Sequence, residues 1–253
     1  MKKTTTYQRL LILFSLLSLI TAVTPLLSCS ELPIRDADVD VYESESGEDI
    51  IDSFVFLGES TTTHLKSRGV LSGGKNTNKV LSTASGTLCL DASIASVKFD
   101  VDGRDMTISE YAAEKRPRRI MLCFGLNGAK RNAAGNGTYF KSCYGKLVTL
   151  IRDSSPDTEI YIQSCYPIAE NMDTAPYGCT PSELNTMIDR INSYAREFAD
   201  ENGIVFVDTA SLLKNEKGML SCGYQSGDGY HLTTDAYVKI LEYIENLGRE
   251  GKL

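Results

Sequence analysis

The stretch Phe56-Leu57-Gly58-Glu59-Ser60-Thr61-Thr62-Thr63 joins an apolar run to a glycine turn and a hydroxyl-rich segment. The apolar run, expected as a strand over Ser53 to Leu57, is nearly continuous in hydrophobic residues, as in strands covered on both faces. In an open α/β sheet, ligands bind outside the carboxyl ends of the strands. Ser60 is therefore expected to project its hydroxyl into a functional site, although a serine there is more often only a helix N-cap.

Short apolar runs alternate with longer helical patterns along the rest of the chain, which is typical of parallel strands joined by crossover helices. The further strands are expected at Lys79 to Thr83, Arg119 to Phe124, Glu159 to Ser164 and Ile204 to Asp208. Two helices are expected over Thr138 to Arg152 and Thr234 to Leu247. The pattern predicts an α/β fold with a central parallel sheet.

Two local signals are sharper than the rest. Thr180-Pro181-Ser182-Glu183 combines a capping box with proline at the first helical position, and the helical spacing that follows stops at Asn202-Gly203. Between Val97 and Ile108, alternation around Asp102-Gly103 predicts a β-hairpin that decorates an edge of the α/β order.

The N-terminal residues 1–29 have the order of an export signal: a basic start, an almost purely apolar run over Leu10 to Ile20, and a short ending Leu26-Leu27-Ser28-Cys29. The ending resembles the lipobox of bacterial lipoproteins, which implies lipid attachment at Cys29 and a cell-surface location. The alternatives are a plain signal peptide or an uncleaved anchor helix.

The charge pattern predicts the nature of residues 30–50 and the kinds of molecule that the protein binds. Residues 30–50 contain eight acids against the single base Arg35, and such a run self-repels, so it is expected to be a solvated tether before a folded domain at 51–250. The formal net charge of the 253 residues is -7, and no cluster of basic residues with aromatics predicts nucleic-acid binding. Because an acidic protein gains nothing from anionic lipid headgroups, membrane attachment would depend on the lipid at Cys29.

The cysteines give weaker expectations. Cys123 and Cys165 lie inside apolar strand-like runs, which favours buried free thiols. Cys179 and Cys222 lie in loop-like segments and are the candidate disulfide pair, although six cysteines after Cys29 allow other connectivities. No Cys/His spacing typical of a zinc site is present, and no metal is expected.

A second functional candidate is Gly227-Asp228-Gly229-Tyr230-His231, just before the last expected helix. The carboxylate of Asp228 stands three residues before His231, a spacing that lets an acid orient an imidazole. A serine hydroxyl becomes an effective nucleophile when such a base removes its proton. Ser60, His231 and Asp228 therefore fit one chemistry, unless Asp228 only caps a turn and His231 lies on the surface.

The third candidate is Asn127 in Phe124-Gly125-Leu126-Asn127-Gly128, again at the end of an apolar strand. A fixed amide donor at a strand end can stabilise the negative charge that develops on oxygen during acyl transfer. The alternative is a turn asparagine that tolerates left-handed geometry beside glycine.

In this order, the three motifs resemble the SGNH/GDSL hydrolase family, whose blocks run Gly-Asp-Ser, a lone Gly, Gly-x-Asn-Asp and Asp-x-x-His. The resemblance spans roughly Ser53 to Leu247 and implies a flavodoxin-like three-layer α/β/α sandwich. It implies Ser60 as nucleophile, His231 as base and Asp228 as its orienting acid, without a cofactor.

The resemblance also implies an oxyanion hole made by the amides of Ser60 and Gly86 and the side chain of Asn127, with Gly73-Gly74 as the fallback for the glycine. Two positions depart from the family pattern: Glu59 stands for the usual Asp before the nucleophile, and Gly128 for the Asp after the asparagine. These departures put in doubt the hydrogen bonding that holds the nucleophile loop.

The function implied is an exported serine esterase that hydrolyses O-acetyl or short acyl esters of carbohydrate. A glycan-binding lipoprotein without catalysis and an acyltransferase are the alternatives. His64, four residues after Ser60, either lines the substrate cleft or, as we expect, faces solvent.

Overall fold

The structure is a computed structural model that describes residues 50–253. The expected signal peptide, the lipid site Cys29 and all but the last residue of the acidic linker lie outside the described residues. In the part that is described, no helix has the length and hydropathy needed to cross a membrane.

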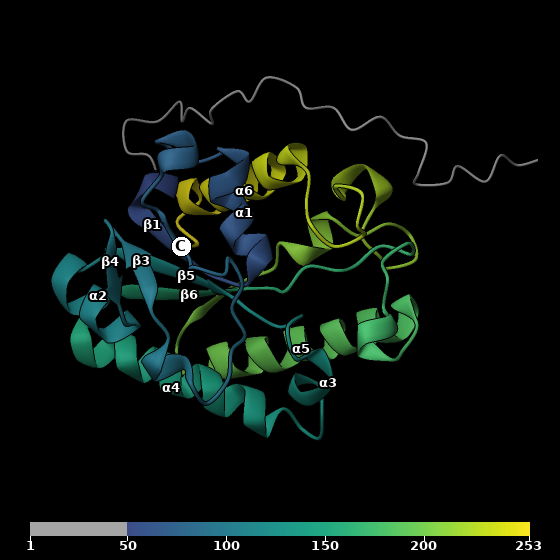
Figure 1. The fold of residues 1–253 in the computed structure, drawn as a ribbon, viewed down its shortest axis with the longest axis horizontal. Helices are drawn as coiled ribbons and strands as arrows, with labels where there is room; N and C mark the ends of the chain where they lie inside the picture. Colours follow the sequence, from purple (N-terminus) through teal and green to yellow (C-terminus); the bar gives the residue numbers. More distant parts are fainter. Residues whose placement is uncertain (1–49) are drawn as a thin grey trace, which may run out of the picture. The chain divides into compact units, whose positions relative to one another are not determined.

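A five-stranded parallel sheet forms the centre of the fold, in the order β2-β1-β5-β6-β7 (Figure 1). The strands are β1 (Phe54–Gly58), β2 (Val80–Leu81), β5 (Arg119–Cys123), β6 (Glu159–Gln163) and β7 (Val205–Val207). All five expected strands are present, and the predicted α/β class is confirmed. The edge strands β2 and β7 are shorter than expected, because each has only one neighbour to pair with.

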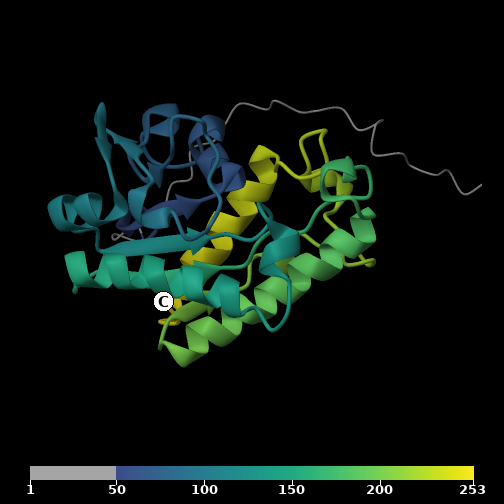
Figure 2. The same cartoon turned by 60° about the horizontal axis from the view of Figure 1, so that its bottom comes forward.

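Helices cover both faces of the sheet, which gives the three layers visible in Figure 2. The helices are α1 (Ser60–Arg68), α2 (Ile108–Lys115), α3 (Ala129–Asn132), α4 (Thr138–Ser154), α5 (Pro181–Glu201) and α6 (Thr234–Arg249). Strand β1 shows why two cores form: Val55 and Leu57 belong to the cluster that includes α2, α4 and α5. Phe54 and Phe56 point the other way, into the cluster with α1 and α6.

Helix α5 begins as its sequence predicts. The Thr180 side chain accepts a hydrogen bond from the Glu183 backbone N–H, and the Glu183 carboxylate accepts from the Thr180 N–H at 2.7 Å. Pro181 follows at the first helical position, where a missing N–H costs no hydrogen bond. Helix α2 has the same capping box at Thr107 and Glu110.

The expected hairpin is present as β3 (Phe99–Val101) and β4 (Arg104–Met106). Its turn residues Asp102 and Gly103 both have positive φ, at 53° and 76°, as a two-residue hairpin turn requires. The Asp100 N–H donates to the Ser82 carbonyl at 3.3 Å, so the hairpin adjoins the β2 edge of the sheet.

One cysteine prediction is wrong and another is confirmed. Cys179 is a free thiol that packs, partly buried, against the hydrophobic core, so the predicted Cys179–Cys222 disulfide does not form. Because the two cysteines lie in loop-like segments far apart in the sequence, their positions do not indicate the distance between their side chains. Cys123 and Cys165 are buried free thiols, as expected.

Candidate active site

Ser60 is the first residue of α1 and directly follows the turn at the end of β1. The turn needs glycine at position 58, because a Cβ there would collide with the Thr62 side chain and the Cys123 carbonyl. A backbone N–H in the first turn of a helix has no partner within that helix. The close approach at Gly58 thus places the Ser60 hydroxyl and its N–H at the carboxyl end of the sheet.

His231 and Asp228 lie beside Ser60, although 171 residues separate Ser60 from the histidine. The His231 Nε2 atom is 3.1 Å from Ser60 Oγ, and its Nδ1 atom is 2.6 Å from Asp228 Oδ2. The structure therefore brings the three predicted residues into one hydrogen-bonded chain.

The Asp228 carboxylate is held by its own loop. Its Oδ1 accepts the backbone N–H groups of Tyr230 at 3.1 Å and His231 at 2.9 Å. Partial burial raises the pKa of Asp228, but the hydrogen bonds from His231 and Tyr230 outweigh it and leave the pKa below its usual value. Gly229, with φ of 86°, lies so close to the backbone of Met172 that no side chain fits there. The loop thus presents an ionised carboxylate to the imidazole.

His64 does not face solvent, so the prediction of a solvent-facing side chain is wrong. It is half-buried, lines the cleft and stacks on His231 with ring centroids 4.1 Å apart. Sequence spacing placed His64 one helical turn after Ser60 but did not say which neighbour that helical face would meet.

Glu59 performs the local hydrogen bonding that its departure from the family pattern put in doubt. Its buried carboxylate accepts the backbone N–H groups of Gly125, Leu126 and Asn127 at 3.0, 3.1 and 3.0 Å. Burial raises the pKa of Glu59 to about 7, although these three hydrogen bonds lower it. The longer side chain thus fastens the nucleophile turn to the Asn127 turn.

The second departure also has a backbone reason. Gly128 has φ of 81° and is the N-cap of α3, a left-handed conformation that glycine adopts without strain.

The two other predicted oxyanion donors lie at the cleft but are engaged. The Asn127 side-chain amide donates to Thr87 Oγ1 at 3.1 Å and to the Leu88 carbonyl at 2.8 Å. The Gly86 N–H donates to the Thr83 carbonyl at 2.9 Å, within a turn in which Gly86 has φ of 67°. The fallback pair Gly73-Gly74 is absent from the residues that line the cleft.

These residues border a cleft of about 660 Å³. Besides Ser60 and His231, its lining is rich in hydroxyl groups and includes two tyrosines: Thr63, Ser67, Ser85, Thr87, Tyr177 and Tyr230. No group of three or more His, Cys, Asp or Glu side chains among residues 50–253 is arranged to hold a metal ion. The chemistry that the cleft offers is that of a serine, a histidine and a carboxylate in series.

Residues 56–239 match the GDSL-like lipase/acylhydrolase family, and the chain belongs to this family. Its members are ester hydrolases, which is the enzyme class of this chain. No curated protein matches the chain.

Solved structures with a similar fold include a Streptococcus pneumonia protein described as a candidate platelet activating factor (18% identity, 77% of this chain and 82% of that chain, TM-score 0.50). A GDSL-like lipase from Bacteroides thetaiotaomicron is 22% identical over 79% of this chain and 88% of its own, with a TM-score of 0.47. An acylhydrolase candidate from Bacteroides fragilis is 20% identical over 88% and 91%, with a TM-score of 0.44. The likeness to the first of these concerns the fold alone.

Proposed function

We propose that the protein hydrolyses esters through an acyl-serine intermediate formed on Ser60. The observation that carries this proposal is the continuous chain of hydrogen bonds from Ser60 through His231 to Asp228. Each contact has the geometry that nucleophile, base and orienting acid require.

In the first half-reaction, Ser60 Oγ attacks the ester carbonyl carbon while its proton passes to His231 Nε2. The tetrahedral intermediate then collapses, the carbon–oxygen bond to the alcohol breaks, and His231 returns the proton to the leaving alcohol oxygen. In the second half, water takes the place of the alcohol and releases the carboxylic acid. Asp228 keeps His231 Nδ1 as the protonated nitrogen, so that Nε2 is free to accept.

The oxyanion is stabilised by the Ser60 N–H at the start of α1 and by the Asn127 side chain. Since Asn127 donates to Thr87 Oγ1 in the free protein, the substrate oxygen takes the place of that hydroxyl. Gly86 joins the hole only when its hydrogen bond to the Thr83 carbonyl opens.

The proposed substrates are O-acetyl or short acyl esters of carbohydrate outside the cytoplasm. Hydroxyl side chains in the cleft can exchange hydrogen bonds with sugar hydroxyls, and Tyr177 and Tyr230 offer ring faces with a polar end. The export signal and the lipid site expected at Cys29 support a cell-surface location. An acyltransferase would use the same residues and differ in giving the acyl group to another hydroxyl.

The departures from the family pattern at Glu59 and Gly128 are the features of the sequence that would favour glycan binding without catalysis. Both have structural reasons at the site, so they no longer favour this alternative.

Release of acid from p-nitrophenyl acetate and from acetylated xylan tests the proposal, with Ser60→Ala as the matched variant. We expect turnover by the wild type and none above background by the variant. Equal background rates for both proteins on these and on longer acyl esters would leave only binding.

A further inference from the structure

His231 is enclosed by aromatic rings as well as by hydrogen bonds. The His64 ring lies with its centroid 4.1 Å away at an interplanar angle of 27°, and the Tyr230 ring lies 3.9 Å away at 38°. Two rings at these distances on one face would touch each other, and no contact between the His64 and Tyr230 rings is present in the described part of the chain. The two rings therefore cover opposite faces of the imidazole.

The two hydrogen bonds at the edge of the imidazole ring do not by themselves fix its orientation. Hydrogen bonds at Nδ1 and Nε2 hold two points of the ring, but the ring can still tilt about the line that joins them. Rings packed on both faces prevent that tilt. The direction of Nε2 toward Ser60 Oγ then depends on His64 and Tyr230.

His64 is tied to the nucleophile by its own helix. It lies four residues after Ser60 in α1, one turn along the same side. Because both side chains extend from one rigid element, the distance between the nucleophile and the covering ring is set by helix geometry.

Several features keep the His64 ring uncharged. Its Nδ1 atom is buried and has no hydrogen-bond partner among the described residues, so a proton there would be unpaired. Burial, then the charges of His231 and Arg68, lower the pKa of His64 to about 4, while Asp228 raises it in part. Near neutral pH, the face of His231 therefore meets a ring without charge.

We propose that His64 is a positioning residue that, with Tyr230, clamps the base His231 between two uncharged ring faces. This inference rests on the proposed role of His231 as base. During the reaction His231 gains a proton, and an uncharged neighbour admits the resulting cation without repulsion. The Tyr230 face adds a cation–π attraction to that imidazolium.

The kinetic test uses the full chain and three variants. In His64→Ala we expect kcat to fall about tenfold because a slightly misplaced base transfers the proton poorly, with KM within about twofold of the wild type. His64→Phe keeps an uncharged ring and should regain most of kcat. Lys66→Ala on the same helix lies outside the cleft lining and should behave as the wild type.

The outcomes separate positioning from substrate binding. A normal kcat in His64→Ala, or a raised KM at constant kcat, would overturn the clamp. A kcat as low in His64→Phe as in His64→Ala would do so as well, because the ring face would then be irrelevant. If His64→Ala fails to fold, His64→Leu fills similar space without an aromatic face and takes its place.

A second readout works even without turnover. The chain has only two histidines, so in every His64 variant the labelled imidazole signals come from His231 alone. We expect the downfield Nδ1 proton of His231 to be sharp in the wild type and in His64→Phe, and broadened by motion in His64→Ala. An equally sharp signal in all three proteins would contradict the clamp. Absence of turnover by a wild type with a sharp signal would instead reject the hydrolase proposal.

Discussion

Two pockets of nearly equal volume lie at opposite ends of the sheet. The cleft with Ser60 and His231 measures about 660 Å³ and lies where β1, β2 and β5 end. A second pocket of about 620 Å³ lies where the same strands begin, and Asp52, Lys79 and Arg118 are part of its lining. If size marked a functional site, the two would be equally good candidates.

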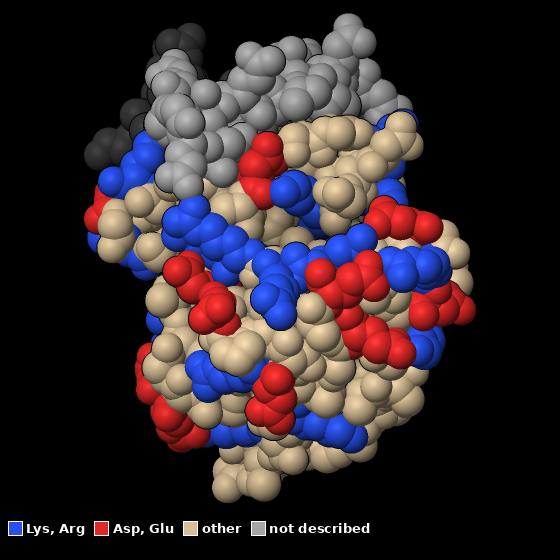
Figure 3. Space-filling view, turned by 90° about the vertical axis from the view of Figure 1, so that its left-hand side faces the viewer, with Lys and Arg blue, Asp and Glu red and all other residues tan. Residues whose placement is uncertain are grey.

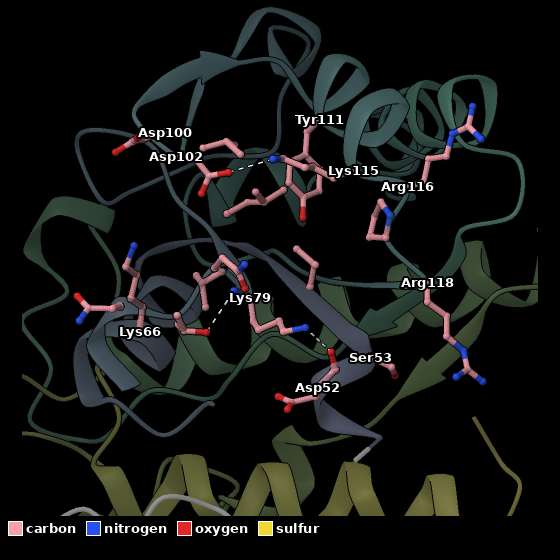
Figure 4. Close-up of a pocket in the computed structure, with 18 of the residues that line it drawn as sticks. Asp52, Ser53, Lys66, Lys79, Asp100, Asp102, Tyr111, Lys115, Arg116 and Arg118 are labelled. Carbon is pink, nitrogen blue, oxygen red and sulfur yellow. Dashed lines mark hydrogen bonds and ion pairs between the residues drawn. The ribbon is translucent and has the colours of Figure 1, made fainter. Parts of the chain in front are cut away.

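The pockets differ in how their polar groups are used. In the second pocket, Lys115 pairs with Asp102 at 2.9 Å and Lys79 donates to the Asp52 carbonyl at 2.5 Å (Figure 4). Basic side chains also form a band beside acidic ones on the face shown in Figure 3. Surface pairs of this kind contribute little and define no reacting atom.

In the cleft, by contrast, side chains from separate elements converge in series on one hydroxyl. Convergence of reactive side chains, and not the volume of a pocket, therefore identifies the site.

The largest effect is expected at the base, His231. We expect His231→Ala to lower kcat by at least about 1,000-fold, because Ser60 loses the group that takes its proton. Lys79→Ala in the other pocket should leave kcat within about twofold of the wild type. Steady-state hydrolysis of p-nitrophenyl acetate by the folded proteins measures both. Similar losses in the two variants would mean that the second pocket also takes part.

The next largest effect is expected at the orienting acid, in Asp228→Asn. The amide keeps an oxygen for the Tyr230 N–H but turns N–H groups toward His231 Nδ1, so the imidazole is driven to the wrong tautomer. We expect kcat to fall about 100- to 10,000-fold with the fold intact. Asp102→Asn, whose carboxylate pairs with Lys115, is the matched control and should retain full activity. A loss of less than about tenfold in Asp228→Asn would contradict the orienting role.

Features encoded over a few residues were predictable from the sequence. The apolar run before Gly58 gave the central strand, and the three-residue spacing of Asp228 and His231 gave their contact. The capping box at Thr180 gave the start of α5 to the residue. Each of these signals depends on local geometry that tertiary packing supports.

Features that depend on packing between distant segments were not predictable. The sequence did not show that His64 stacks on His231, because the partner of a helix face is set by the docking of α1 beside the loop before α6. Nor did it show that both Asn127 amide hydrogens are engaged by Thr87 and Leu88. These contacts join segments that only the tertiary fold brings together.

The buried carboxylate of Glu59 makes the stability of the fold depend on pH. Because burial raises its pKa to about 7, the folded chain binds more protons than the unfolded chain between about pH 4.5 and 7. The stability that this group contributes is fully present below that window. It decreases as pH rises, by up to about 1.4 kcal/mol per pH unit.

Glu59→Gln cannot ionise and should lack this slope. We expect the free energy of unfolding of the wild type to fall by about 1 to 3 kcal/mol relative to the variant between pH 5 and pH 8. Urea unfolding at several pH values measures the difference. A difference in the free energy of unfolding that does not change with pH would contradict this prediction. It would show that the three N–H donors of the Gly125–Asn127 turn offset the free-energy cost of burying the Glu59 carboxylate.

The smallest effect is expected at the exposed carboxylate of the second pocket. Lys115→Ala removes the partner of Asp102, but both side chains are in contact with water, so the Asp102 carboxylate is hydrated when the pair is lost. The melting temperature should therefore change by no more than about 2 °C, and raising the salt concentration should shrink even that difference. Thermal unfolding of both proteins at low and high salt measures it. A larger decrease in melting temperature that salt does not affect would mean that the Lys115–Asp102 pair stabilises the hairpin. The polar groups at this end of the sheet would then contribute more than a surface pair does.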